Sequence, residues 1–90
     1  MDKQSQSTTN QMQATFSMLV MSVASSAAMS MGLAPNPQTG KVESDKNMAK
    51  FNIDLLLCLQ EKTKGNLSPD EKKLIEDLLG DLQMKFLNLK

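Results

Sequence analysis

The sequence predicts an all-α protein built from three helices in one domain. Apolar residues recur at three- and four-residue spacing in three segments. Helix-capping residues flank those segments, and proline- or glycine-containing stretches separate them. We therefore expect a three-helix protomer with helices at about 11–31, 45–63 and 69–88, in a single domain over 11–90 that follows a disordered tail over 1–10.

The first predicted helix is unusual because it carries no charge. The tail before it contains Gln, Ser and Thr but no apolar residue from Asp2 to Asn10, and Gly32 is a plausible C′ residue after the helix. From Gln4 to Gly40 there is no Lys, Arg, Asp or Glu. A solvent-facing helix normally shows a charged stripe, so we expect this helix to be buried on most sides. Its apolar spacing runs through Met12, Phe16, Leu19, Val23, Ala27 and Met31.

The second predicted helix starts at Ser44 as N-cap, with Asp45 in its first turn. Its apolar arc is wide, which predicts a central helix with two neighbours and a Cys58 that packs rather than reacts. The arc consists of Met48, Phe51, Leu55 and Cys58, widened by Ala49, Ile53, Leu56 and Leu59.

The strongest local signal is the start of the third helix. Ser68 is an N-cap, Pro69 stands at N1 and Glu71 completes a capping box. Gly65 ends the preceding helix, so a sharp turn is expected to make the last two helices an antiparallel hairpin. Gly80 inside the third helix is compatible with a close helix crossing or with an exposed site where the glycine has no packing role, and we favour the crossing. The buried face is predicted to be Leu74, Ile75, Leu78, Leu79, Leu82, Phe86 and Leu89.

Size and composition predict that the protomer is completed by oligomerisation. Area scaling gives burial of about 64% of the unfolded surface, which is marginal for a monomer, and there are three Phe and no Trp or Tyr. Ser22, Ser26 and Ser30 form a row of small residues that lets two helices approach closely. The pattern leaves open whether the first helix packs in cis or swaps onto a partner. The predicted oligomer interface is Phe16, Leu19, Ser22, Val23, Ser26, Ala27 and Ser30.

The composition also excludes several functions. Ten lysines without any arginine balance ten acids, so no basic surplus exists for DNA or RNA. With no His and one Cys, the chain alone supplies neither a zinc site nor a His-activated nucleophile. We expect no catalytic residue, no cofactor and no metal. A single cysteine fits a reducing cytoplasm.

The uncharged segment allows other interpretations. The segment is long enough for a transmembrane span but too polar for one. It also lacks the basic start that a cleaved signal peptide needs. A membrane-peripheral or membrane-anchored protein that uses the helix 11–31 is the alternative to an interaction protein. Soft-metal handling by Met18 with Met21 and by Met29 with Met31 would suit Cu(I), although such methionines usually pack.

The connector Leu33–Val42 contains two prolines and a Thr-Gly pair, so it is extended and turn-rich. It lacks the spacing of a phosphate-binding loop. Because loops often carry function, it is a candidate partner-binding feature. The alternative is that its prolines only hold the crossover. The candidate residues are Asn36, Pro37, Thr39, Gly40 and Lys41.

Several motifs in order resemble a known family. They are the run Glu61–Ser68, the upstream Asn36–Lys41, Ala49-Lys50 followed by Ile53-Asp54-Leu55, and Asp81-Leu82. Over about 14–88 they resemble the bacterial domain of unknown function 1844, with a departure at Gln83–Lys85, where an arginine is expected. The resemblance implies a bacterial cytoplasmic helical protein and transfers no catalytic residue. The function we predict is a non-catalytic, homo-oligomeric interaction or scaffold protein.

Overall fold

The computed structural model describes residues 14–89 and confirms an all-α, three-helix architecture. The helices are α1 (Phe16–Ser30), α2 (Lys46–Lys62) and α3 (Pro69–Leu87). Over 14–89 the extended pairing is limited to one isolated antiparallel bridge, between Met31 and Ser44. The predicted tail over 1–10 lies outside the described residues.

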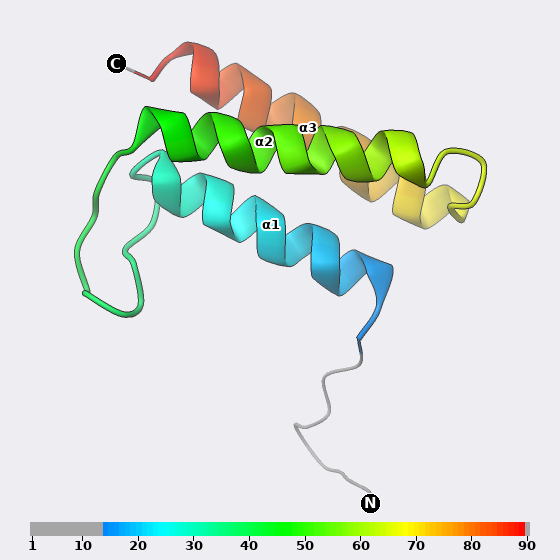
Figure 1. Cartoon of the computed structure of the whole chain (residues 1–90), viewed down its shortest axis with the longest axis horizontal. Coiled ribbons are helices and arrows are strands. Elements are labelled where there is room, and N and C mark those ends of the chain that lie inside the picture. The colour runs from blue at the N-terminus through cyan, green and yellow to red at the C-terminus, as the bar shows by residue number, and fades with distance from the viewer. Residues whose placement is uncertain (1–13, 90) are drawn as a thin grey trace, which may run out of the picture.

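The three helices pack around one core. Figure 1 shows α1 and α3 on either side of α2, and α1 also contacts α3. The turn between Thr63 and Ser68 reverses the chain, so the start of α3 lies beside the end of α2. In the described structure α1 packs on α2 and α3 of the same chain.

Two helix starts differ from the sequence prediction, and capping explains both. The first helix is predicted to start at about residue 11, whereas α1 starts at Phe16, because the Thr15 Oγ1 accepts a hydrogen bond from the Met18 N–H (3.1 Å); residues 11–13 lie outside the described part of the chain. The cap of α2 is Asp45 rather than Ser44, since Asp45 Oδ1 accepts from the Met48 N–H (3.1 Å). Ser44 instead pairs with Met31.

The start of α3 is confirmed as a capping box. Ser68 Oγ accepts from the Glu71 N–H (3.2 Å), and Glu71 Oε1 accepts from the Ser68 N–H (2.9 Å). Pro69 occupies N1, where no intrahelical donor is needed. Two orphan donors of the helix are thereby satisfied reciprocally.

The core confirms the predicted face of α3 and corrects that of α2. Every predicted apolar residue of α3 is buried or packs against the core. On α2 the core-facing arc is Ala49, Ile53 and Leu56, whereas most of the other predicted arc faces solvent. The buried apolar residues are Val20, Ala24, Ala27, Met31, Ala49, Ile53, Leu56, Ile75, Leu79 and Leu82.

The close helix crossing predicted at Gly80 is wrong. Gly80 is exposed, and a Cβ added to it would meet nothing within 4 Å. Gly80 therefore lowers the stability of α3 and does not allow another helix to approach more closely.

Replacing Gly80 by alanine is expected to stabilise the protein by about 0.5–1 kcal/mol, because alanine loses less backbone entropy in a helix. Gly65→Ala is the matched contrast. Gly65 has a φ of 85°, so alanine there should destabilise by about 1 kcal/mol. Urea unfolding followed by circular dichroism measures both, and a loss of stability in Gly80→Ala would contradict the open environment of this residue.

Leu56→Ala is expected to destabilise the protein by about 2–5 kcal/mol, because Leu56 is fully buried between the helices and its truncation leaves a cavity. Leu87→Ala is the matched control, since Leu87 is 84% exposed and should change stability little. The comparison uses the urea midpoint, and similar midpoints for the two variants would place Leu56 outside the core.

Candidate interaction surface

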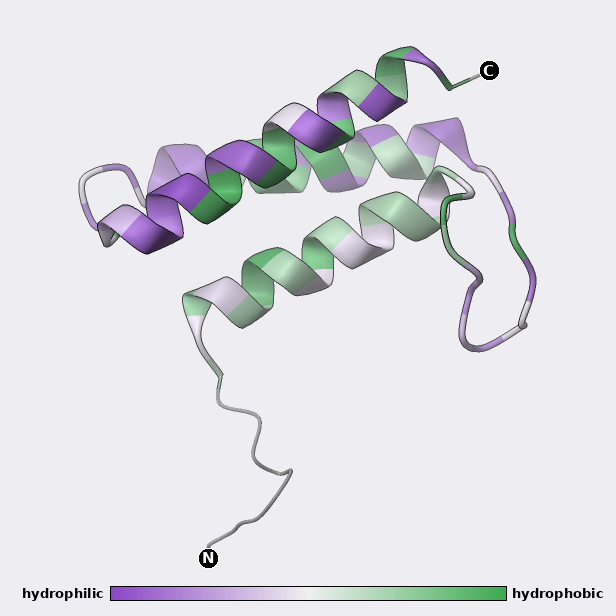
Figure 2. Ribbon diagram, turned by 180° about the vertical axis from the view of Figure 1, so that it is seen from behind, coloured by the Kyte–Doolittle hydropathy of each residue, from purple (hydrophilic) through white to green (hydrophobic). Residues whose placement is uncertain are grey.

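The outward side of α1 is apolar and uncharged. Met18, Leu19 and Met21 are exposed, Leu19 to 48%. Ser22 and Ser25 lie between them on the surface. In Figure 2, α1 is green to near-white along its length, whereas α2 and α3 carry strongly hydrophilic purple segments. A helix of this composition normally faces a partner rather than water.

A second exposed apolar row runs along α2, and we call it the α2 stripe. It consists of Met48, Phe51, Leu55 and Cys58, whose three- and four-residue spacing places them on one side of the helix. Phe51 is 53% exposed, and the Cys58 thiol is also exposed. The prediction that Cys58 packs in the core is therefore wrong, because the core takes the neighbouring arc of α2.

The α2 stripe adjoins α1 at its N-terminal end. A cavity of about 320 Å³ is bounded there by both helices and by the connector between them. Its lining residues are Ser26, Met29 and Ser30 of α1, Asn36, Glu43 and Asp45 of the connector, and Met48 and Asn52 of α2. On α1, Leu19, Ser22, Ser26 and Met29 follow one another at three- and four-residue spacing, so this row of side chains continues away from the cavity. One surface therefore spans both helices, which we call the neutral face: Leu19, Ser22, Ser26 and Met29 with the α2 stripe.

Asn52 fixes the two helices below the neutral face. Its side chain is 6% exposed, and its Nδ2 donates to the Met48 carbonyl (3.0 Å) and to Ser30 Oγ (3.4 Å). Ser30 Oγ in turn donates to the Ser26 carbonyl (2.8 Å). The Asp45 N–H donates to the Ser30 carbonyl (2.7 Å), which holds the end of α1 against the start of α2.

The residues predicted for the oligomer interface fall into three groups. Ala27 is buried in the core, while Phe16 and Val23 are half-buried against it. Leu19 and Ser22 are exposed. The remaining two serines, Ser26 and Ser30, are half-buried at the cavity between the helices.

Sequence reasoning did not find the α2 stripe, because it assigned those residues to the core. The signal for this stripe in the sequence was the width of the apolar arc on α2. The arc takes up more of the helix circumference than α1 and α3 cover. The core arc, Ala49 with Ile53 and Leu56, and the α2 stripe lie on adjacent sides of the helix.

The predicted partner-binding loop forms a compact turn. The Asn36 N–H donates to the Lys41 carbonyl (2.8 Å), and the Gly40 N–H donates to the Asn36 carbonyl (2.7 Å). Asn36 Oδ1 also accepts from the Gln38 N–H (2.8 Å). Pro37, Thr39, Gly40 and Lys41 are exposed, whereas Asn36 is half-buried. These hydrogen bonds give the turn its own shape, and partner binding by it stays a prediction.

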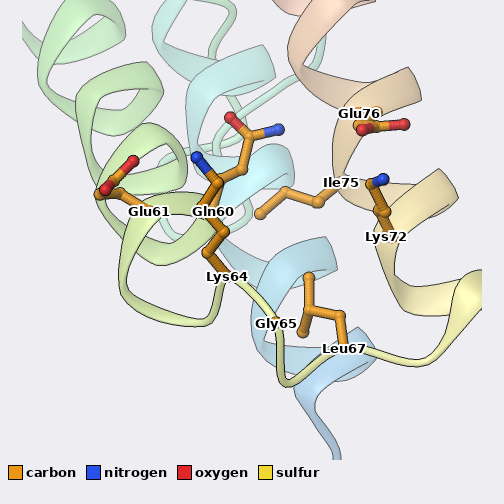
Figure 3. A pocket seen from close by; sticks show the side chains of 8 residues that line it. All are labelled: Gln60, Glu61, Lys64, Gly65, Leu67, Lys72, Ile75 and Glu76. Carbon is orange, nitrogen blue, oxygen red and sulfur yellow. The ribbon is translucent and has the colours of Figure 1, made fainter.

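A cavity of about 510 Å³ lies at the other end of α2, beside the turn that leads to α3 (Figure 3). It is lined by the end of α2, the following turn and the first turns of α3. Lys64 and Lys72 contribute positive charge, and Glu61 and Glu76 contribute equal negative charge. This balance gives the cavity no preference for a ligand of either sign.

The charged side chains pair along exposed helix faces. Lys50–Asp54 (2.8 Å), Lys73–Asp77 (2.9 Å) and Lys85–Asp81 (2.8 Å) are ion pairs one helical turn apart. The hydrogen bond and charge of Asp77 raise the pKa of the Lys73 ammonium. Such exposed pairs contribute little to stability.

The described residues form neither a metal-ion cluster nor a membrane-spanning helix. Over 14–89, no group of three His, Cys, Asp or Glu side chains is placed to hold a metal ion. Within the same range, each helix is too short or too polar to cross a bilayer. Of the methionine pairs considered for a soft metal, Met29 and Met31 are separated, since Met31 is buried in the core while Met29 borders the cavity, whereas Met18 and Met21 are both exposed on α1.

The fold and the neutral face define a small three-helix protein with an uncharged candidate interaction surface. A family model described as a domain of unknown function (DUF1844) matches residues 13–88. The chain belongs to this family, which confirms the resemblance. Comparisons with curated proteins and with solved structures each gave no match.

Asn52→Ala is expected to destabilise the protein by about 1–2 kcal/mol, because it removes the hydrogen bonds that join α2 to Ser30. Asn66→Ala in the exposed turn is the control and should change stability little. Urea unfolding measures both. Equal stability of the two variants would show that the Asn52 contacts do not hold α1 on α2.

Proposed function

We propose that this protein is a non-catalytic interaction protein that assembles with copies of itself through the neutral face. The exposure of this face across α1 and α2 is the observation that carries the proposal. Contiguous exposed apolar surface of this kind marks interaction sites in soluble proteins. The α2–α3 antiparallel hairpin serves as the frame, and a reducing cytoplasm is the compartment that a lone exposed thiol fits.

Self-association is favoured over a charged partner by the chemistry of the face. Leu19, Phe51 and Leu55 supply apolar area, and Ser22 and Ser26 supply small side chains that permit close approach. A charged partner would have to desolvate its own groups against the apolar and small side chains in the middle of this surface, which carry no counter-charge. A second copy presents the same uncharged side chains there.

A membrane surface is the alternative occupant of the neutral face. Helices that lie in a membrane interface are usually rich in Lys and Arg on their polar side. Because α1 has neither, we favour protein assembly over membrane binding. Flotation with anionic phospholipid vesicles tests this choice, and co-flotation of the wild-type chain would favour the membrane.

Phe51→Asp is expected to shift the purified protein toward monomer at micromolar concentration, because it buries an unpaired carboxylate in the interface. Met84→Asp is the matched control, since Met84 is an exposed apolar residue of α3 outside the neutral face. Light scattering coupled to size-exclusion chromatography measures the mass of both variants and of the wild type.

Ser22→Asp should act in the same direction as Phe51→Asp, and Lys73→Asp should not, because Lys73 lies on the exposed side of α3. A monomeric wild-type chain at micromolar concentration would overturn the proposed function. Equal effects of Phe51→Asp and Met84→Asp would remove the neutral face as the interface.

A further inference from the structure

The α2 stripe has an acidic end and a basic end. Glu43 and Asp45 border the same cavity as Met48, the first residue of the stripe. At the other end, Lys62 follows Cys58 by one helical turn and continues the same side of the helix. The α2 stripe therefore runs from negative to positive charge along its length.

The remaining lysines of α2 are turned away from the stripe. Lys50 Nζ lies 2.8 Å from Asp54 Oδ2 in an exposed ion pair. Lys46 Nζ lies 5.7 Å from the centroid of the Phe86 ring on α3. The acidic residues at the start of the stripe are thus not offset by these two lysines on the same side.

We infer that the partner on the neutral face is a second copy that pairs antiparallel along α2, with a two-fold axis beside Leu55; this inference rests on the proposed function. Met48 and Lys62 each lie seven residues from Leu55, which is about 10.5 Å along the helix. Antiparallel pairing about Leu55 brings Lys62 level with Met48 of the second copy. There the ammonium reaches Glu43 and Asp45, and two-fold symmetry makes this contact twice.

A parallel pairing along the same stripe is disfavoured by charge. It would place Glu43 and Asp45 beside the same residues of the second copy and Lys62 beside its own equivalent. Like charges at such distances repel, and they suppress wrong arrangements of an interface. Antiparallel helices also align their dipoles favourably. Because a two-fold interface uses the same face on both copies, the assembly closes as a dimer.

Charge reversal tests this pairing in the full chain. Lys62→Glu and Glu43→Lys are each expected to weaken the dimer roughly fivefold in Kd, as two exposed ion pairs are replaced by repulsion. The variant that carries both reversals should bind more tightly than Lys62→Glu alone, because the reversed pair attracts again, while the unchanged Asp45 keeps its affinity below that of the wild type. Asp45 stays unchanged because it caps α2. Sedimentation equilibrium gives the Kd, and failure of the double variant to regain affinity would overturn the antiparallel pairing.

Cysteine crosslinking tests the register. In a Cys58→Ser background, Leu55→Cys should form a disulfide-linked dimer under mild oxidation, because this position lies beside the two-fold axis. Met48→Cys and Lys62→Cys should crosslink efficiently when mixed but poorly when alone. Met84→Cys is the exposed control on α3 and should not crosslink beyond the random-collision level.

The two tests separate this inference from the proposed function. A dimer that is disrupted by Phe51→Asp but shows self-crosslinking of Met48→Cys would retain the proposed function and overturn the antiparallel pairing. A monomeric wild-type chain would overturn both. A dimer with Leu55→Cys crosslinking and affinity regained in the double reversal would support both.

Discussion

The attachment of α1 to the start of α2 is the interaction on which the rest of the structure depends. Ser30 makes it with both its backbone and its side chain: its carbonyl accepts from the Asp45 N–H, and its hydroxyl oxygen accepts from Asn52. The bridge from Met31 to Ser44 closes the intervening loop at the same place. With this end fixed, Val20, Ala24 and Ala27 reach the core, and the uncharged opposite side of α1 is left facing outward.

The uneven distribution of charge then decides which surfaces are candidates for interaction. The hairpin of α2 and α3 places its ion pairs on exposed sides, where water solvates them. α1 has no charged residue to place, and α2 has more apolar circumference than two neighbours can cover. A chain of this size cannot bury all of this apolar surface within one three-helix protomer. The neutral face is the apolar surface that the other helices of the chain leave uncovered.

Local signals in the sequence predicted most of the fold. The capping box at Ser68 with Glu71, the apolar face of α3 and the three-helix architecture were all readable because each depends on residues close in sequence. The choice between two adjacent apolar arcs on α2 was not readable. It depends on where α1 and α3 lie, so the side of Phe51 and Leu55 looked as core-like as that of Ile53 and Leu56. Gly80 was misjudged for the same reason, since a close crossing is a property of a neighbouring helix.

The cis packing of α1 has a consequence for the order of folding and assembly. The turn between α2 and α3 is short, and most residue contacts join positions fewer than twelve apart, so the contacts of this helical fold are mostly local. Helical proteins with such contacts fold in microseconds to milliseconds, independently of concentration. Subunit association is slower and second order. In the proposed assembly, the single chain folds first, and its neutral face is then still exposed to water. The time that it spends as a monomer becomes shorter as the concentration of the protein in the cell rises.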